Sequence, residues 1–581
     1  MTKHWRIQQP DPGHVKTISN GLNCSAVTAS ILVNRNLTAV DTARAFLNPT
    51  LQQLNSPCAL KDMDTAVGRI EKALHHQEKI LIFGDYDVDG ITATVILFEF
   101  LQKAGATVSY YIPDRFTEGY SLQAHHIEEY AAQNRIALVI TTDCGSSSHA
   151  GARAAQKEGI DLIITDHHKV PDSLPEALAV INPQRPNCSA GFQNLAGVGV
   201  ALALIICLRK HLRDNGYWEN HPEPNLRSLC DLVALGTIAD SVPLTGENRI
   251  FTRVGLDVIR TGSAHPGIEE LLKISRTPRE TVGAEDVGFR LAPRLNAAGR
   301  MDHAGRAAKL LLSDRSTEAR KLALTLDSLN AQRKDTEQEM LQEILGYLHR
   351  HQQELDKRSL VLAGSHWHEG VLGIVAARLA DKFYRPVVLI STRGASGKGS
   401  ARCVDGINLY KCLAACTDQL DRFGGHAMAA GLAIHVDAIP VFRDKFETVV
   451  RAETAEKQPV AVVCVDYEIQ FDAICDRIID EIETLEPFGN GNPDPIFMAR
   501  DVRVRDSKIV GKHHRRMDLF QPGIAGEKVF GAIQFNVDTR IQQPDAFEKI
   551  AFRLHWNRWN GRKSIQLFIE ETLPKRQAAD R

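Results

Sequence analysis

The feature that most limits the fold is an alternation of strand-like and helical segments between residues 79 and 181. Short apolar runs alternate with stretches in which apolar residues recur at helical spacing. The strand-like runs cover 79–83, 107–112, 137–142, 161–165 and 178–181, and the helical stretches cover 91–103, 122–133 and 150–158. Such an alternation predicts an α/β domain built on a doubly wound parallel sheet.

Charged and imidazole side chains directly follow four of these predicted strands. They are Asp85, Asp87 and Asp89 after the first, Arg115 after the second, Asp143 after the third, and Asp166-His167-His168 after the fourth. In doubly wound sheets, ligands bind beyond the carboxyl ends of the strands, so these residues should share one rim. An acidic turn or an accidental His pair would explain each segment alone. Their coincidence at one rim favours a site for two metal ions.

The residue types also indicate the chemistry of such a site. Carboxylates and imidazoles without Cys select Mn²⁺ or Mg²⁺ over structural Zn²⁺. Asp240 ends an apolar segment and is a further candidate ligand, although alone it could be a helix end. Two ions about 3.5–4 Å apart can activate water and stabilise an in-line displacement at phosphorus. Hydrolysis of a phosphoester or phosphoanhydride is therefore the expected chemistry.

The motifs DYDVDG, Asp143, Asp166-His167-His168 and Asp240-Ser241, in this order, resemble those of the DHH phosphoesterase superfamily over residues 57–310. The resemblance implies metal ligation by Asp87, Asp89, Asp143, His167 and Asp240, with Asp143 bridging both ions. It also implies that His168 contacts the scissile phosphate, so that Asp89, Asp143 and His168 form the catalytic set. One departure is Phe83, where small-substrate members carry His. Asp85 is an additional acid, and whether Asp85 or Asp87 completes the first metal site stays open.

A long charged helix is expected over 313–358, and a second α/β unit follows it. This unit resembles the DHHA1 substrate domain, which implies that Gly424, Gly425 and His426 face a nucleic-acid backbone. Ser400 and Arg402, together with Arg115, would bind a terminal phosphate. The segment 293–304 is expected to form an Arg- and Gly-containing turn, or a plain loop between helices, in which Arg294 is a candidate substrate contact.

After residue 456 the sequence predicts a small OB-like barrel. The expected strands cover 497–504, 508–510, 517–520, 529–535, 549–555 and 564–570. Trp556 and Trp559 lie among basic residues that include Arg503, Arg505, Lys508, Lys512, Arg515, Arg516, Arg558, Arg562 and Lys563. Guanidinium groups beside flat rings suit a single nucleic-acid strand, although either tryptophan could instead belong to the core.

Composition sets the remaining limits. A chain of 581 residues with 43% hydrophobic residues and a net charge of −2 is an ordinary globular protein of three or four domains. The predicted limits are 1–56 for a helical leader, 57–310, 311–357, 358–455 and 456–581. No apolar run approaches a membrane span, and the start lacks a signal-peptide core, so we expect a cytoplasmic protein. The 11 cysteines form no CxxC pair, which predicts reduced thiols and no structural zinc.

The complete order of parts resembles the single-strand-specific exonucleases of the superfamily. The resemblance implies metal-dependent 5′-to-3′ degradation of single-stranded DNA to 5′-mononucleotides, in recombination and repair. It further implies a monomer that works with single-stranded-DNA-binding protein and a helicase. One alternative is a small-substrate phosphodiesterase or pyrophosphatase, for which a basic barrel has no use. Another is a non-catalytic single-strand-binding scaffold, for which the full set of acids and imidazoles has no use.

Overall fold

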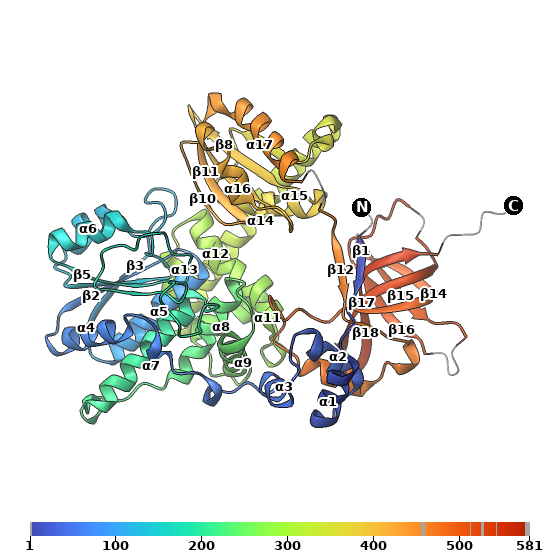
Figure 1. Ribbon diagram of the computed structural model, residues 1–581, viewed down its shortest axis with the longest axis horizontal. Helices are drawn as coiled ribbons and strands as arrows, with labels where there is room; N and C mark the ends of the chain where they lie inside the picture. The colour runs from blue at the N-terminus through green and yellow to red at the C-terminus, as the bar shows by residue number, and fades with distance from the viewer. Residues whose placement is uncertain are drawn as a thin grey trace. The chain divides into compact units, whose positions relative to one another are not determined.

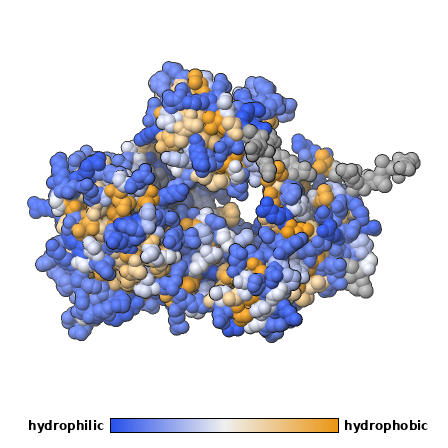
Figure 2. All heavy atoms as spheres, viewed as in Figure 1, coloured by the Kyte–Doolittle hydropathy of each residue, from blue (hydrophilic) through white to orange (hydrophobic). Residues whose placement is uncertain are grey.

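The computed structural model describes residues 3–454, 459–511, 513–523, 528–541, 543–559 and 561–575. The chain forms two compact units. The larger comprises Asn55–Val242 and Val254–Val460, and the smaller comprises Met1–Leu54, Pro243–Arg253 and Ala461–Arg581. The face shown in Figure 2 is predominantly hydrophilic, with small groups of hydrophobic residues between charged ones. Among the described residues, no helix has the length and apolar character needed to cross a membrane.

The larger unit begins with the predicted doubly wound sheet. Five parallel strands lie in the order β3-β2-β4-β5-β6. Their bounds are Lys79–Gly84 (β2), Thr107–Tyr111 (β3), Leu138–Thr142 (β4), Asp161–Thr165 (β5) and Ala179–Ile181 (β6). The strand order reverses between β2 and β4, where β2 pairs with β3 on one side and with β4 on the other. The crevice beside such a reversal is where ligands bind in this class of fold.

Helices cover both faces of this sheet (Figure 1). On one face, the π-helical turn η3 (His126–Ala131) and α6 (His149–Glu158) pack on alternate strand residues such as Leu81 and Val139. The other layer contains α4 (Met63–His75), α5 (Val88–Lys103) and α7 (Gly197–Asp214), with α7 packed against α4 and α5. The strands β2, β4, β5 and β6 are therefore almost fully buried, as their continuous apolar runs require, whereas the edge strand β3 is only partly buried.

A helical region connects this sheet to a second one. Its helices are α8 (Cys230–Ala239), α10 (Pro266–Ser275), α11 (Ala284–Asp286), α12 (Ala292–Met301), α13 (Gly305–Leu311) and the 35-residue α14 (Ser316–Arg350). The helix α9 (Gly246–Arg260) belongs to this region only from Val254 onward, since its first part is assigned to the smaller unit. The expected turn over 293–304 is wrong, because most of this segment is the helix α12. Pro293 lies in its first turn, where proline is tolerated. Gly299 allows α12 to approach the backbone oxygen of Tyr86, and a Cβ there would lie 2.9 Å from it.

The second sheet of the larger unit is mixed, in the order β10-β11-β9-β8-β7. Its strands are Leu360–Gly364 (β7), Val387–Arg393 (β8), Ser396–Arg402 (β9), Arg422–Gly425 (β10) and Ala429–His435 (β11). The helices α15 (Leu372–Phe383), α16 (Leu409–Ala414) and α17 (Ile439–Glu453) bury its apolar residues. This arrangement leaves one side of β9, β10 and β11, rich in glycine, facing a cleft.

The smaller unit contains the predicted barrel. Its strands are Phe497–Val510 (β14), His514–Phe520 (β15), Phe530–Gln534 (β16), Ala546–Trp559 (β17) and Arg562–Pro574 (β18). They close in the order β14-β15-β16-β18-β17-β14. A five-stranded barrel with the order 1-2-3-5-4-1 has OB topology. The two expected strands over 497–510 are one strand with an irregularity between Val504 and Asp506, which mimics a turn in the sequence.

The N-terminal segment Met1–Leu54 completes this unit. The strand β1 (His4–Ile7) pairs with β12 (Val462–Val465), and the two-residue strand β13 (Tyr467–Glu468) pairs with β14. Three helices, α1 (Pro12–Leu22), α2 (Ala26–Asn34) and α3 (Val40–Leu47), share the barrel's hydrophobic core together with α18 (Asp476–Glu483). The N-terminal and C-terminal segments therefore fold as one structure.

Candidate metal centre and substrate cleft

The acidic cluster is built where β2 turns into α5. The Asp87 carboxylate caps the helix by accepting hydrogen bonds from the amides of Asp89 and Gly90, at 3.0 and 3.1 Å. Asp89, in the first turn, accepts hydrogen bonds from the amides of Gly197 and Val198 at 2.6 and 2.9 Å. Those amides begin α7, so the positive end of a second helix stabilises this carboxylate. Two helix starts therefore fix the orientation of Asp87 and Asp89.

The neighbouring strands bring further ligand candidates to the same rim. Asp143 follows β4 with a left-handed backbone (φ +62°), an uncommon conformation for aspartate. His167, after β5, places Nε2 at 3.1 Å from Asp143 Oδ1, 3.6 Å from Asp240 Oδ2 and 3.8 Å from Asp89 Oδ2. Asp240 reaches this point from the end of α8. Four segments far apart in the sequence thus converge as predicted.

Three sets of side chains offer ligand atoms that all lie within 4.8 Å of one another. They are Asp143-His167-His168, Asp89-His167-Asp240 and Asp85-Asp87-Asp143. Asp143 belongs to two of the sets. Both Asp85 and Asp87 belong to the third set, so the geometry leaves open which of them is the ligand.

Burial and charge show that this cluster fits a cation. Burial, followed by repulsion from neighbouring carboxylates, raises the pKa of Asp89 to about 7 and that of Asp240 to about 9. The pKa values of Asp85 and Asp143 rise well above the usual range for the same reasons. Among the described residues, Asp143 Oδ1 and His167 Nε2 are buried atoms without a hydrogen bond, although they lie 3.1 Å apart. A hard divalent cation would satisfy both atoms and offset the repulsion.

His168 is held differently from His167. Its Nδ1 lies 2.8 Å from Asp166 Oδ1, and Asp166 also accepts hydrogen bonds from the amides of Ser146 and His167. Burial disfavours the charged imidazole, but the hydrogen bond and charge of Asp166 outweigh burial and raise the pKa of His168 to about 9. Burial and the charge of His168 lower the pKa of His167 to about 4. The pair therefore provides one cationic donor and one neutral ligand.

A cleft of about 1090 Å³ lies between this centre and the second sheet. Asp85, Asp87 and His168 line one side of it. The other side carries the predicted phosphate-binding residues Ser400, Arg402, Gly424, Gly425 and His426, and Arg115 also lines the cleft. Arg402 donates a hydrogen bond to Ser400 Oγ at 3.1 Å. The backbone of Gly373 packs against both, and a Cβ there would lie 2.6 Å from Arg402.

The cleft is also lined by cationic side chains that the sequence analysis did not identify, namely those of Lys169, Lys398, Arg422 and, on α12, Arg300. The Nη1 of Arg300 donates to the Gly370 carbonyl at 3.1 Å. Burial, followed by the charges of Arg115, Arg333 and Arg402, lowers the pKa of Arg300 to about 10. Arg300, Arg115 and Arg402 therefore form one cluster of positive charge beside the acidic centre.

Arg294, the predicted contact on the same helix, lies elsewhere. Its Nε donates to Asp327 on α14 at 2.8 Å, and Arg294 is not among the residues that line the cleft. Arg294 and Arg300 are separated by more than one helical turn and lie on different faces of α12. Helical spacing could have separated the two arginines if the segment had been identified as a helix.

The two predicted tryptophans belong to the barrel. Trp556 is half-buried against the barrel core, donates its indole N–H to Asp480 at 2.9 Å and lies 3.7 Å from Lys563 Nζ. The side chains of Trp559 and Arg562 and the whole of Lys512 lie outside the described residues. Arg515 is buried and bound to Asp545, so it does not belong to an exposed basic surface. The stacking roles of the tryptophans stay predictions.

The chain has the features of a DHH phosphoesterase with a DHHA1 domain. These features are the parallel sheet, the reversal of strand order between β2 and β4, and the cluster of Asp and His side chains beside it. Family models agree: residues 79–237 match the DHH family N-terminal domain, 356–452 the DHHA1 domain and 465–571 the RecJ OB domain. The DHH and OB matches lie within the regions predicted for these domains, and the DHHA1 match overlaps the predicted 358–455 but begins at residue 356. The outer limits of the domains stay predictions.

The chain belongs to the RecJ family, as the following relatives show. Single-stranded-DNA-specific exonuclease RecJ of Salmonella typhimurium is 37% identical over 89% of this chain and 91% of its own length. The protein of the same name from Bacillus subtilis is 37% identical over 98% of this chain and 70% of its own length. The crystal structure of RecJ with Mn²⁺ from Thermus thermophilus superimposes with a TM-score of 0.84 at 29% identity, covering 99% of this chain and 80% of that one.

The relatives also support the predicted metals. A second crystal structure of Thermus thermophilus RecJ contains Mg²⁺ and matches with a TM-score of 0.77 at 28% identity, over 99% of this chain and 79% of that one. The acidic cluster described above fits ions of this kind. The predicted cofactors, Mg²⁺ or Mn²⁺, are thus confirmed at the level of the family.

Proposed function

We propose that this chain is a metal-dependent exonuclease that degrades single-stranded DNA from the 5′ end and releases 5′-mononucleotides. The observation that carries the proposal is the position of the cationic cluster opposite the acidic centre within one cleft. Arg402, Ser400 and Arg115 can hold a terminal phosphate while the next phosphodiester lies among the Asp and His side chains. Cleavage would then occur at a fixed distance from the strand end.

The metal site proposed for this reaction consists of Asp87 or Asp85, Asp89, Asp143, His167 and Asp240. Asp143 and His167 each belong to two of the three ligand groups, and of these two only the carboxylate has two oxygens to offer to two ions, so Asp143 is the candidate bridging ligand. Two divalent ions bound there would supply an activated water and neutralise charge at phosphorus. Two contacts hold the carboxylates of this site in position. The first amides of α7 donate hydrogen bonds to Asp89, and His167 lies close to Asp143.

The remaining side chains act on the substrate. His168, kept protonated by Asp166, is positioned to donate a hydrogen bond to an oxygen of the scissile phosphate. Gly424 and Gly425 let a nucleic-acid backbone approach β10 closely, since no side chain projects there. His426 follows them and can supply a donor. Arg300 adds positive charge to the same cleft.

The proposal extends to the setting of the enzyme. Its relatives are named for action on single-stranded DNA, and recombination and repair are the processes in which we expect it to act. All 11 cysteines are free, which suits a reducing cytoplasm. Single-stranded-DNA-binding protein and a helicase are the proposed partners of a monomeric enzyme.

One digestion experiment tests chemistry, strandedness and direction together. An oligonucleotide labelled separately at each end is incubated with and without Mn²⁺, as a single strand and as a blunt duplex. We expect metal-dependent release of mononucleotides from the 5′ end of the single strand only. His167→Ala should abolish the release, whereas His349→Ala, an exposed histidine on α14, should not. Loss of the 3′ label first would contradict the proposed direction.

A further inference from the structure

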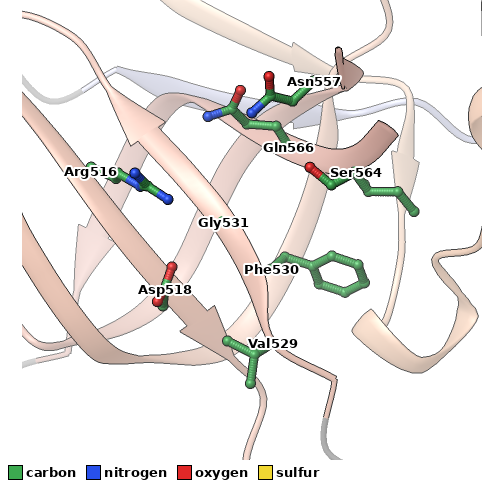
Figure 3. A pocket seen from close by; sticks show the side chains of 9 residues that line it. Arg516, Asp518, Val529, Phe530, Gly531, Asn557, Ser564 and Gln566 are labelled. Carbon is green, nitrogen blue, oxygen red and sulfur yellow. The ribbon is translucent and has the colours of Figure 1, made fainter. Parts of the chain in front are cut away.

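The turn between β3 and η3 forms part of the wall of the substrate cleft. Residues 115–120 all line the cleft, and Arg115 is the arginine that this turn contributes to the cationic cluster. A smaller pocket of about 370 Å³ lies on the barrel, where Arg516 and Asp518 place one cation and one anion on the same strand (Figure 3). The cleft differs from that pocket, because three arginines of like charge converge in it.

The charges of the cluster work against this position of Arg115. Burial, followed by the charge of Arg115, lowers the pKa of Arg402, and Arg115 acts on Arg300 in the same sense. The three guanidinium groups therefore repel one another in the absence of a phosphate. The Arg115 guanidinium lies over the Tyr86 ring, 5.2 Å from its centroid. Such a contact is worth only about 0.5–1 kcal/mol where water has access, so the backbone that carries Arg115 must also be held.

Glu118 holds this backbone by two short hydrogen bonds. Its Oε2 accepts from the amide of Asp114 at 2.7 Å, and its Oε1 accepts from the hydroxyl of Tyr111 at 2.7 Å. Asp114 in return accepts from the amides of Phe116 and Thr117, at 2.8 and 2.9 Å. The side chains at both ends of the turn are thus bonded to its backbone, in a reciprocal arrangement like that of a helix capping box. Tyr111 is the last residue of β3, so Glu118 also ties the turn to the sheet.

A buried imidazole lies behind the Glu118 carboxylate. The Nδ1 of His126 accepts a hydrogen bond from the amide of Gln123 at 3.0 Å, so in the neutral ring the hydrogen is on Nε2. Burial, followed by the charge of His125, lowers the pKa of His126 to about 4, which keeps the ring neutral. Its Nε2 lies 3.8 Å from Glu118 Oε2 and has no hydrogen bond among the described residues. The N–H dipole therefore faces the carboxylate and favours its present position.

We propose that Glu118, anchored by Tyr111, is a positioning residue that holds Arg115 in the cationic cluster and thereby sets the preference for a phosphorylated strand end. The inference rests on the proposed function, since it requires that the cluster bind a terminal phosphate. Glu118 does not bind the phosphate itself, because a carboxylate repels an anion and both of its oxygens are engaged by the turn and by β3. It acts by fixing Arg115 before the strand arrives, which reduces the ordering that binding must impose.

The test compares the binding of two single-stranded oligonucleotides to the full chain in EDTA, which prevents metal-dependent hydrolysis. Both carry fluorescein at the 3′ end, and they differ only in a 5′-phosphate or a 5′-hydroxyl. In the wild type, the 5′-phosphate should lower the Kd about 10- to 100-fold. Glu118→Gln keeps the size of the side chain but turns an amide N–H toward one of the two donors, so this Kd ratio should fall about 5-fold or more. Tyr111→Phe removes a single hydrogen bond and should lower the ratio about 2- to 10-fold.

Two comparisons separate positioning from general damage. Tyr130→Phe is the matched control, because Tyr130 packs on the Tyr111 ring with centroids 4.7 Å apart but has no hydrogen bond to Glu118 within the part of the chain that the structure describes. It should keep the wild-type ratio. In an Arg115→Ala background, Glu118→Gln should cause no further fall, because a residue that acts through Arg115 has nothing left to position. An additional fall in that background would show that Glu118 does not act through Arg115.

Digestion of the end-labelled oligonucleotide with Mn²⁺ separates this inference from the proposed function. If the wild type releases no mononucleotides, the proposed function is wrong, while the Kd ratios still measure the role of Glu118. If Glu118→Gln and Tyr111→Phe both keep the wild-type ratio, the positioning role is excluded, whatever the digestion shows. A wild type that binds both strand ends equally would exclude it as well, since there would be no end preference for Glu118 to set.

Discussion

Asp89 is restrained more tightly than metal ligation alone would require. Both of its oxygens accept hydrogen bonds from the first amides of α7, and the lack of a side chain at Gly197 brings that helix against Asp143. A Cβ on Gly197 would lie 2.5 Å from Asp143 Oδ1, closer than real contacts allow. The start of α7 therefore sets the distance between two of the candidate ligands.

Gly197→Ala should consequently damage the metal centre without unfolding the protein. The added methyl must displace the Asp143 carboxylate, and overpacking of this kind costs about 1–3 kcal/mol. We expect Mn²⁺ affinity, measured by calorimetric titration, to fall about tenfold or more. Gly199→Ala, on the same helix, only contacts the flexible Leu195 side chain and should retain wild-type affinity. Equal losses in both variants would refute the special role of Gly197.

Arg402 should determine the preference for a phosphorylated strand end. Its guanidinium lies beside Ser400 in the cleft, and a charged hydrogen bond is worth about 1.5–3 kcal/mol. In Arg402→Ala, the ratio of kcat/KM for 5′-phosphate and 5′-hydroxyl substrates should fall about 10- to 100-fold, with Mn²⁺ affinity unchanged. Arg294→Ala is the comparison, because Arg294 binds Asp327 outside the cleft. A similar fall of this kcat/KM ratio in Arg294→Ala would indicate that Arg294 does contact the substrate.

At the scale of single residues, the sequence predicted which acids and imidazoles gather at the site, but it did not predict which way individual side chains on a helix or strand point. The acids and imidazoles follow strands whose ends must meet, so their convergence follows from the fold class. Arg300 and Arg294 share one short segment, and only the rotation of α12 decides which of them faces the cleft. Trp556 is a second case, since its register position opposite Ile565, and not its residue type, directs its ring toward the barrel core.

Among the elements, α10 is tied to its neighbours by a buried ion network. His265 precedes α10, and its Nδ1 lies 2.8 Å from Asp231 on α8, while its Nε2 lies 3.2 Å from Glu99 on α5. Burial opposes the charge, but the hydrogen bonds to Asp231 and Glu99 outweigh it and raise the pKa of His265 to about 10. The protonated imidazole therefore stabilises the packing of three helices.

This network predicts how stability depends on pH. Because the folded-state pKa lies above the unfolded value of about 6.5, the stabilisation is fully present below pH 6.5 and is lost as pH rises toward 10. His265→Gln should lower the free energy of unfolding by about 3 kcal/mol at pH 6. The difference in free energy of unfolding between His265→Gln and the wild type, measured by urea titration, should be smaller at pH 7.5 and smaller again at pH 9. His211→Gln, which removes a more exposed pair with Glu71, should show a small effect. If this difference in free energy increased with pH, the protonated state assigned to His265 in the folded protein would be wrong.

Most elements of the parallel sheet could be predicted, because each buried strand is a continuous apolar run and each helix has a clear period. One error arose where proline and glycine serve the packing of a helix. Pro293 and Gly299 are residue types that are common in turns. Here Pro293 lies in the first turn of α12, and Gly299 allows this helix to pack against the backbone of Tyr86. The irregularity in β14 likewise resembled a break between two strands. In each case a tertiary contact overrides the local signal.

For the molecule as a whole, the order of the domains along the chain was predictable. The packing of the N-terminal segment against the C-terminal barrel in one compact unit was not. The pairing of β1 with β12 joins His4–Ile7 to Val462–Val465, and no local pattern reveals a contact between segments so far apart in sequence. The helix α2 is buried over most of its length, and its residues share one hydrophobic core with Phe471, Ile479 and the barrel strands. The segment Met1–Leu54 is therefore a structural part of the barrel unit.

This partnership can be tested by hydrogen–deuterium exchange. Ile31 on α2 is fully buried in the shared core, and truncating such a side chain costs about 2–5 kcal/mol. In Ile31→Ala, amides of β14 to β18 and α18 should exchange faster, although these elements are remote from α2 in sequence. Amides of β2 to β6 should be unaffected, because they belong to the other unit. Val441→Ala, an exposed site on α17, should change neither set. Faster exchange confined to α1 to α3 would mean that these helices form a separate structure and do not stabilise the barrel.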